Sequence, residues 1–314
     1  MLFIASHEFP PQHGGIATFT FEVVRALHEA GEPSHLLVPE NGAWPASFDP
    51  DPQVKLELER LPIAPTHGIS ATWRMAKALK SHQSALQDAL LILTEPGPIR
   101  ALYLAVRWLN LKLPRFRIVV HGSELMRGLR SPLWSRPIRF ALREAETVAT
   151  VSHYNASLLI EKYQVAPDRI MVLPLAAKRE LVSGKGASGR SPTPEKTRLR
   201  LITVARLHPR KGQDRVLEAL QELPADLLRR IDYHIVGDGR SRRFKKRLRV
   251  LARSCGAPVV FAGALDNREL IKAYQAADLF ILTSRQHRSS VEGFGLVYIE
   301  ANWFGLPVIG TRTG

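Results

Sequence analysis

Two glutamates lie eight positions apart around a Gly-Phe-Gly turn near the end of this 314-residue chain. Glu292 precedes the turn, and a carboxylate there is also explained by the helix dipole. Glu300 lies among Leu, Val, Ile and Trp residues, where a buried carboxylate needs polar partners. Carboxylates accept hydrogen bonds from vicinal hydroxyls. We therefore expect the pair to bind the two sugars of a nucleotide sugar, while the N–H groups of the turn face its diphosphate.

A basic stretch, "RLHPRKG", follows an apolar run earlier in the chain and contains Arg206, Arg210 and Lys211. Arginine binds phosphate oxygens in a bidentate manner, and lysine adds a mobile point charge. A solvated basic turn is the simpler alternative. The position directly after a predicted strand favours a phosphate site.

Several tight turns follow other apolar runs. Gly14 and Gly15 begin a predicted helix, where backbone N–H groups and the helix dipole favour phosphate. His121 opens the stretch "HGSE", Gly237 belongs to "VGDG", and Leu265 belongs to "GALDN". Each is equally compatible with a structural turn or a structural histidine.

Short apolar runs alternate with longer helical patterns along the chain, which predicts parallel sheets covered by helices. The predicted strands are Leu2–Ser6, His35–Val38, Leu90–Thr94, Arg117–His121, Val148–Val151, Arg169–Leu173, Leu201–Ala205, Tyr233–Val236, Val259–Ala262, Leu279–Thr283 and Val308–Gly310. The fold class is therefore α/β, with two Rossmann-like, doubly wound parallel-sheet domains facing a cleft. Ligands of such sheets bind beyond the carboxyl ends of the strands.

A stretch rich in Gly, Ser, Pro and charge separates the two halves. It predicts an N-terminal domain over residues 1–175, a linker or mobile loop over 176–198, and a C-terminal domain over 199–314.

The composition indicates an anionic partner, because the chain has 44 Lys and Arg against 29 Asp and Glu, a net charge of +15. The single cysteine, Cys255, excludes an internal disulfide and argues against a structural zinc site. We read no signal peptide and no membrane-spanning run, and so expect a cytoplasmic protein.

The stretches "EGFGLVYIE", "RLHPRKG", "VGDG" and "HGSE" and the N-terminal glycine pair occur in the order seen in retaining glycosyltransferases of family 4. The sequence resembles that family from His7 to Gly314. The resemblance implies the GT-B architecture of two Rossmann domains. It also implies retaining transfer of a hexose from a UDP- or GDP-linked sugar to an acceptor hydroxyl, lipid-linked or on a glycan, without a metal or a further cofactor.

The resemblance also implies roles for individual residues. Glu300 would bind the donor ribose and Glu292 the transferred sugar. Arg206 and Lys211 would neutralise the leaving diphosphate, and His121 would contact the sugar near the anomeric centre. The remaining donor-binding residues would be Gly14, Gly15, Gly237, Leu265, Phe294, Gly295 and Leu296. The N-terminal domain would bind the acceptor and the C-terminal domain the donor.

The chain departs from the family at "TRTG", where members usually continue with further elements, so the resemblance implies an incomplete C-terminal domain. Two basic amphipathic segments, residues 127–143 and 240–254, suggest a peripheral location at an anionic membrane surface. Solvated helix faces are the alternative.

Two other functions remain open at this stage. One is a GT-B scaffold that binds nucleotide sugar without turnover or acts as an epimerase. The other is a basic nucleic-acid-binding protein, supported only by the charge and lacking a recognition module.

Overall fold

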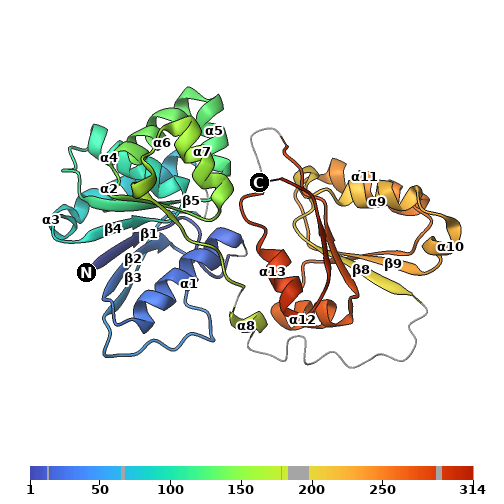
Figure 1. Ribbon diagram of the computed structural model, residues 1–314. Helices are drawn as coiled ribbons and strands as arrows, with labels where there is room; N and C mark the ends of the chain where they lie inside the picture. Colours follow the sequence, from blue (N-terminus) through green and yellow to red (C-terminus); the bar gives the residue numbers. More distant parts are fainter. Residues whose placement is uncertain (13, 65–67, 178, 183–197, 288–291, 314) are drawn as a thin grey trace. The chain divides into compact units, whose positions relative to one another are not determined.

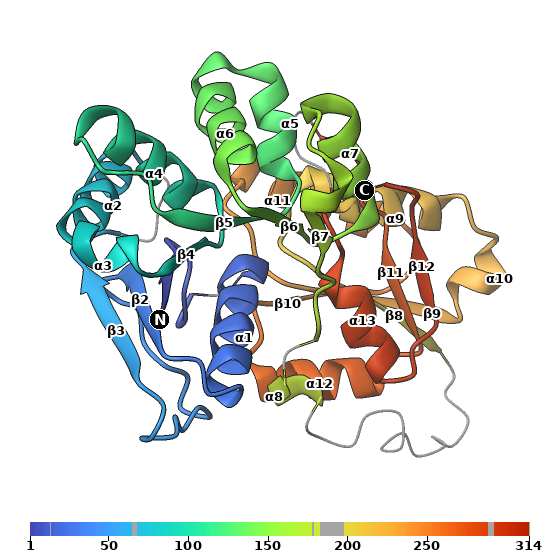
Figure 2. The ribbon, with the colours of Figure 1, turned by 60° about the vertical axis from the view of Figure 1, so that its left-hand side comes forward.

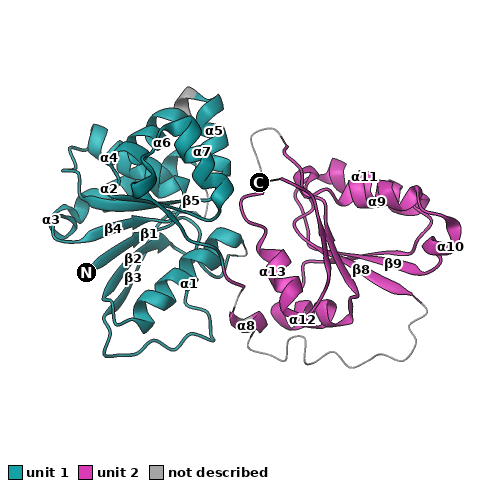
Figure 3. Cartoon of the chain, in the orientation of Figure 1, with its two compact units in different colours: residues 1–175 teal, residues 176–314 magenta. Residues whose placement is uncertain are grey.

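The computed structural model describes residues 1–314 except residues 13, 65–67, 178, 183–197, 288–291 and 314. The chain divides into two compact units, residues 1–175 and residues 176–314 (Figure 3). Each unit is described by itself below.

Unit 1 contains a sheet of seven parallel strands in the order β3-β2-β1-β4-β5-β6-β7 (Figure 1). These strands are β1 (Leu2–Ala5), β2 (Ser34–Pro39), β3 (Leu56–Leu61), β4 (Leu90–Leu93), β5 (Arg115–Val120), β6 (Thr147–Thr150) and β7 (Ile170–Val172). The order places β1 and β4 side by side at the centre, and the chain moves outward from there in both directions. Because the strands are parallel, the carboxyl ends of β1, β4 and β5 lie side by side at the same end of the sheet.

Helices cover both faces of this sheet. They are α1 (Gly15–Glu29), α2 (Ile69–Ser81), α3 (Gln83–Gln87), α4 (Pro96–Trp108), α5 (Ser123–Arg130), α6 (Pro132–Glu144), α7 (His153–Tyr163) and the 3-10 helix η1 (Pro167–Arg169). The larger core lies beneath α2, α4, α6 and α7, and a smaller one lies beneath α1, on the other face. Successive residues of a strand point to opposite faces of the sheet, so Phe3 packs in the larger core and Ile4 packs in the smaller one.

Unit 2 contains a sheet of five parallel strands in the order β10-β9-β8-β11-β12 (Figure 2). The strands are β8 (Leu199–Val204), β9 (Ile231–Val236), β10 (Val259–Gly263), β11 (Leu279–Leu282) and β12 (Val308–Gly310). The helices are α8 (Arg179–Val182), η3 (Pro209–Lys211), α9 (Gln213–Gln221), α10 (Ala225–Leu228), α11 (Arg242–Ser254), α12 (Asn267–Ala276) and α13 (Leu296–Trp303). One core lies beneath α9 and α11 and includes Cys255, and the other lies beneath α12 and α13.

The predicted fold class is confirmed in its main feature, two α/β units that are each built on a parallel sheet. Every predicted strand is present within a few residues of its expected bounds, but β3 was not predicted. The predicted linker over 176–198 begins with a short helix, α8, whose Leu181 is buried. Residues 183–197 lie outside the described part of the chain.

The basic segment over residues 127–143 forms parts of two helices, α5 and α6, in unit 1. Ile138 and Leu142 on α6 are buried in the larger core, while Arg136, Arg139 and Arg143 are exposed. The second basic segment forms α11, which buries Phe244 and Leu248. Among the described residues, no helix combines the length and the apolar character needed to cross a membrane.

Candidate functional site

In unit 2, Glu292 is the centre of a charged cluster at the carboxyl ends of β8 and β11. Its Oε2 atom accepts hydrogen bonds from Arg210 Nη1 at 2.8 Å, Lys211 Nζ at 2.6 Å and Ser284 Oγ at 2.9 Å. β8 and β11 are neighbouring parallel strands, so the loops that follow them lie side by side at the carboxyl end of the sheet. The side chains of Arg210, Lys211 and Glu292 are 12%, 13% and 12% exposed, so the ion pairs are largely shielded from water.

Burial and charge oppose each other in this cluster. Burial alone would raise the pKa of Glu292, but the charges of Lys211 and Arg210 outweigh it and hold that pKa below its ordinary value. Burial lowers the pKa of Lys211, and the carboxylate of Glu292 offsets part of that effect. Burial and the surrounding cations also lower the pKa of His208. The cluster therefore carries excess positive charge around an ionised carboxylate.

Arg206 and Lys211 were predicted to act together, yet the structure places them differently. Lys211 donates to Glu292, whereas Arg206 is exposed, and among the described residues it is not one of the three donors to Glu292. The carbonyl of Arg206 accepts a hydrogen bond from Gln213 Nε2 at 3.0 Å. Arg210, which sequence reasoning placed in the basic stretch without assigning it a role, takes the second position beside Glu292.

The helix α13 begins at Leu296, two residues later than the predicted start near Phe294. Its N-cap is Gly295, which has a φ of 82° and packs so closely on the Tyr298 ring that a Cβ would approach it to 2.6 Å. Glu292 is therefore not the helix cap that the simpler interpretation required.

Glu300 lies on α13 and is 5% exposed, which agrees with the buried carboxylate expected from its neighbours in sequence. Its Oε2 accepts a hydrogen bond from Tyr274 Oη of α12 at 2.9 Å. Burial and the neighbouring carboxylate raise the pKa of Tyr274 well above its usual value, so the phenol remains a donor. The Tyr274 ring stacks on Phe304, which fixes its position.

Gly237 and Leu265 also follow strands of unit 2. Gly237 has a φ of 125°, and a Cβ there would lie 2.1 Å from the Ala205 carbonyl oxygen. Close backbone packing therefore explains this glycine without any ligand. Leu265 packs against the core beneath α12 and α13.

In unit 1, a second carboxylate lies at the corresponding edge of the sheet. Glu95 follows β4 and is fully buried. Its Oε1 accepts from the backbone N–H of His7 at 2.9 Å and lies 3.1 Å from His7 Nδ1, and its Oε2 accepts from the N–H of Gly97 at 2.6 Å. Glu95 is thus the N-cap of α4 and connects the ends of β1 and β4. Sequence reasoning missed it, although a carboxylate directly before a proline is typical of a helix start.

His121 lies at the carboxyl end of β5, as predicted. Its Nε2 donates to the carbonyl oxygen of Thr94 at 2.9 Å, so this nitrogen carries a proton. The backbone N–H of His121 donates to the Glu124 carboxylate, and the ring lies edge-on to Phe19 of α1. The histidine is partly buried and its orientation is fixed.

The predicted glycine pair precedes and begins α1, with Gly14 as N-cap and Gly15 as first helical residue. A Cβ at Gly15 would meet no atom within 4 Å, so packing among the described residues does not require glycine there. The phosphate contact expected for Gly14 and Gly15 therefore stays a prediction.

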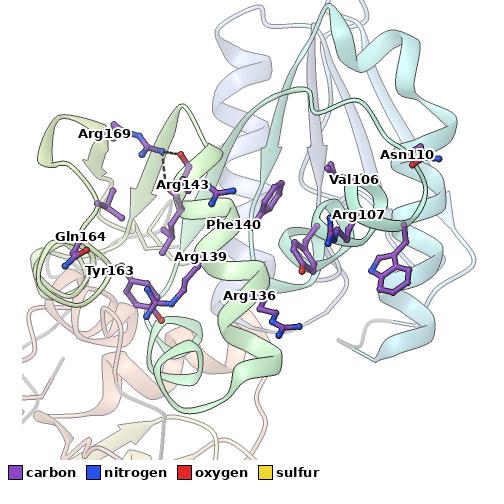
Figure 4. A pocket seen from close by; sticks show the side chains of 14 residues that line it. Val106, Arg107, Asn110, Arg136, Arg139, Phe140, Arg143, Tyr163, Gln164 and Arg169 are labelled. Atoms are coloured by element: carbon purple, nitrogen blue, oxygen red, sulfur yellow. Dashed lines mark hydrogen bonds between the residues drawn. The ribbon is translucent and has the colours of Figure 1, made fainter.

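Unit 1 also contains a basic hollow of about 1200 Å³ between α4, α6 and the end of α7 (Figure 4). Five arginines contribute to its lining together with aromatic side chains: Arg107, Arg136, Arg139, Arg143, Arg169, Tyr103, Trp108, Phe140 and Tyr163. Arg139 lies over the Tyr163 ring, 5.3 Å from its centroid. No carboxylate is among the 14 lining residues, so the hollow favours anions.

Two family descriptions match the chain. "Glycosyl transferase 4-like domain" matches residues 14–176, more than half of the chain, and "Glycosyl transferases group 1" matches residues 188–314. Together they cover both units.

Similar proteins of known name include the "GDP-mannose-dependent alpha-(1-6)-phosphatidylinositol monomannoside mannosyltransferase" of Mycobacterium tuberculosis, 27% identical over 99% of this chain and 80% of the relative. The "GDP-mannose-dependent monoacylated alpha-(1-6)-phosphatidylinositol monomannoside mannosyltransferase" of Corynebacterium glutamicum is 39% identical over 35% of this chain and 28% of its own length.

Solved structures support the fold. HepE of Anabaena, in complex with UDP and glucose, has a TM-score of 0.67 at 17% sequence identity. The match covers 100% of this chain and 81% of the HepE chain. WaaG, a glycosyltransferase involved in lipopolysaccharide biosynthesis, has a TM-score of 0.67 at 19% identity over 99% of this chain and 81% of its own.

Proposed function

Because the chain belongs to the family 4 glycosyltransferases of GT-B architecture, which act on nucleotide sugars, we propose a more specific reaction for it. It transfers mannose from GDP-mannose, with retention of anomeric configuration and without a metal, to a hydroxyl of an inositol-containing glycolipid. The observation that carries the proposal is the Glu292 cluster with Arg210 and Lys211. The name of the mycobacterial relative supports the choice of donor and acceptor.

The cations of the cluster fit the charge that develops in this reaction. When the bond between the anomeric carbon and the phosphate oxygen breaks, its electron pair goes to the leaving diphosphate. Lys211 and Arg210 supply positive charge where that negative charge grows, in a largely buried place where electrostatic interactions are strong. This charge can replace the role that a metal ion has in other transferases.

The state of Glu292 supports retention without a protein nucleophile. Its Oε2 already accepts three hydrogen bonds and its pKa is lowered, which makes the carboxylate a weak nucleophile. It is better suited to accept hydrogen bonds from sugar hydroxyls. In the proposed step the acceptor oxygen bonds to the anomeric carbon on the face that the diphosphate leaves, and the acceptor proton goes to a phosphate oxygen.

The donor can be tested by titrating the protein with GDP-mannose, UDP-glucose and ADP-glucose, using the Glu300→Gln variant for comparison. We expect tightest binding of GDP-mannose, with binding to the variant weakened by about 1–3 kcal/mol if the buried carboxylate binds the ribose. NMR of the product reports the anomeric configuration. Preference for another donor would refute the mannose assignment, and an inverted product would refute retention. Binding without transfer would support the scaffold, and a changed sugar on the nucleotide would support an epimerase.

We further propose that the basic hollow of unit 1 contacts an anionic membrane surface, which places the enzyme at the cytoplasmic face beside its lipid acceptor. Arginines favour anionic headgroups, and aromatic side chains suit the interface. Vesicles containing phosphatidylinositol should sediment the protein at low salt and release it as salt rises.

A matched pair of variants separates this site from general charge. Arg136→Gln with Arg139→Gln removes two charges from the hollow, and Arg242→Gln with Arg243→Gln removes two from α11 in unit 2. We expect the first pair to weaken sedimentation more than the second. Equal losses would show that only net charge matters.

A further inference from the structure

Two histidines and two glutamates cluster on the β2–β3 side of the unit 1 sheet. His35 lies near the start of β2, Glu57 and Glu59 lie on the edge strand β3, and His82 is the C-cap of α2. Glu59 Oε2 is 2.8 Å from both His35 Nε2 and His82 Nε2. We call these three residues the His35–Glu59–His82 cluster.

The cluster has the donor atoms of a metal site. One ligand atom from each residue lies within 4.8 Å of the other two, and the ligands come from three separate elements. Two imidazole nitrogens and one carboxylate oxygen are a donor set that zinc accepts, with water as a fourth ligand. All three side chains are partly buried, so an ion and its water can reach them from solvent.

The surroundings of His35 separate this cluster from a simple ion pair. Its second ring nitrogen, Nδ1, is 2.8 Å from Glu57 Oε2. The other carboxylate oxygen of Glu57, Oε1, is 2.9 Å from Lys55 Nζ. The Phe3 ring stacks on the imidazole with centroids 4.8 Å apart and an interplanar angle of 20°. A histidine that binds a metal commonly donates its other N–H to a carboxylate, which fixes its tautomer and orientation.

One carboxylate oxygen faces both imidazoles of the cluster. His35 Nε2 is 2.8 Å from Glu59 Oε2. An ion bound here would replace that hydrogen bond with one bond to each of the two ligand atoms. His82 approaches the same oxygen from α2 and completes the set of ligands.

We propose that the His35–Glu59–His82 cluster binds one divalent ion of the zinc type, with Glu57 as the outer carboxylate that orients His35. The single cysteine does not bear on this site, because no thiolate is involved. His35 lies near the amino end of β2, Glu59 lies in the middle of the edge strand β3, and His82 follows α2. None of the three follows the carboxyl end of a strand, where the residues proposed for sugar transfer lie. The ion therefore has a structural role, connecting the edge strand β3 to β2 and to the end of α2.

The test is a zinc titration of the protein after chelator treatment, measured by calorimetry and by metal content. We expect one zinc per chain, an increased midpoint of thermal unfolding, and a tetrahedral absorption spectrum with cobalt as probe. Magnesium should produce none of these effects, because it prefers oxygen ligands.

Variants distinguish this cluster from adventitious binding by other histidines. His82→Ala and Glu59→Gln should lose the saturable site, and Glu57→Gln should weaken zinc binding by about 10–100-fold. His234→Ala is the matched control, because His234 pairs with Asp232 at 2.7 Å and belongs to no three-residue group in the described part of the chain. It should bind zinc as the wild type does.

The proposal is overturned if the wild type takes up no stoichiometric zinc, or if His82→Ala and Glu57→Gln both bind as tightly as His234→Ala. Circular dichroism checks that each variant is folded. If His82→Ala fails to fold, the partial loss expected for Glu57→Gln decides the matter. Zinc uptake does not depend on glycosyl transfer, so a failure here leaves the proposed function untouched.

Discussion

The two units each place a carboxylate at the carboxyl edge of a parallel sheet, but they hold it in different ways. In unit 1, Glu95 is fully buried and accepts hydrogen bonds from the backbone N–H groups of His7 and Gly97. In unit 2, Glu292 is partly exposed and is held by the side chains of Arg210, Lys211 and Ser284. Backbone donors cannot leave without unfolding a helix end, whereas side-chain donors can turn toward a ligand. The comparison indicates that Glu95 stabilises the fold, and it leaves Glu292 able to take the role proposed for it in sugar transfer.

The largest expected effect breaks the charged side of this comparison. Lys211→Ala should decrease turnover at saturating donor, because it removes a cation proposed to stabilise the leaving diphosphate. The expected increase in the activation free energy is about 2.7–4 kcal/mol. Steady-state kinetics with GDP-mannose and a lipid acceptor measures this effect. Arg215→Ala is the control, since Arg215 is an exposed cation on α9 that pairs with Glu218.

A different result would assign Lys211 to ground-state binding. If Lys211→Ala weakens donor binding but keeps wild-type turnover at saturation, with chemistry rate-limiting, then the basic stretch after β8 does not stabilise the leaving group.

A medium effect tests the structural side. Glu95→Gln should lower the free energy of unfolding of unit 1 by about 1–3 kcal/mol, because one buried N–H would then face an amide NH₂ group. Chemical denaturation of the variant and of Glu292→Gln, side by side, measures the difference. Equal stability losses in the two variants would contradict the distinction between a backbone-held and a side-chain-held carboxylate.

The smallest expected change in stability sharpens the comparison at α1. Gly15→Ala places a methyl group in open space at the first helical position, so it should leave the free energy of unfolding unchanged or raise it by up to about 1 kcal/mol. If a ligand phosphate approaches this backbone, the same variant should nonetheless raise the KM for the donor. Unchanged kinetics would leave Gly15 with only a role in the turn.

Most of the fold could be predicted because buried parallel strands are short apolar runs bounded by turns. The strand β3 was missed because "LELERL" is not a continuous apolar run: Glu57, Glu59 and Arg60 stand between its leucines, a pattern typical of a half-buried strand. Its position at the edge of the sheet explains the charges, since one face of an edge strand can contact water.

The sequence predicts which loops carry the candidate site residues, but it does not predict which side chains in those loops contact one another. The sequence places Arg206, Arg210 and Lys211 within six positions, yet the turn of η3 decides which of them lie beside Glu292. Spacing alone does not reveal this choice, because it depends on the local conformation of the loop. The partners of Glu95 could not be predicted because they include the backbone N–H groups of His7 and Gly97, and the position of Glu95 before Pro96 indicates only a helix start.

The location of Cys255 gives unit 2 a chemical reporter of its own. This residue is the only cysteine in the chain, is 1% exposed, and lies in the unit 2 core beneath α9 and α11. A thiol reagent can therefore modify the protein only when that core opens. The rate of modification measures the opening of unit 2 without contribution from unit 1. A substitution such as Glu95→Gln that loosens only unit 1 would leave this rate unchanged.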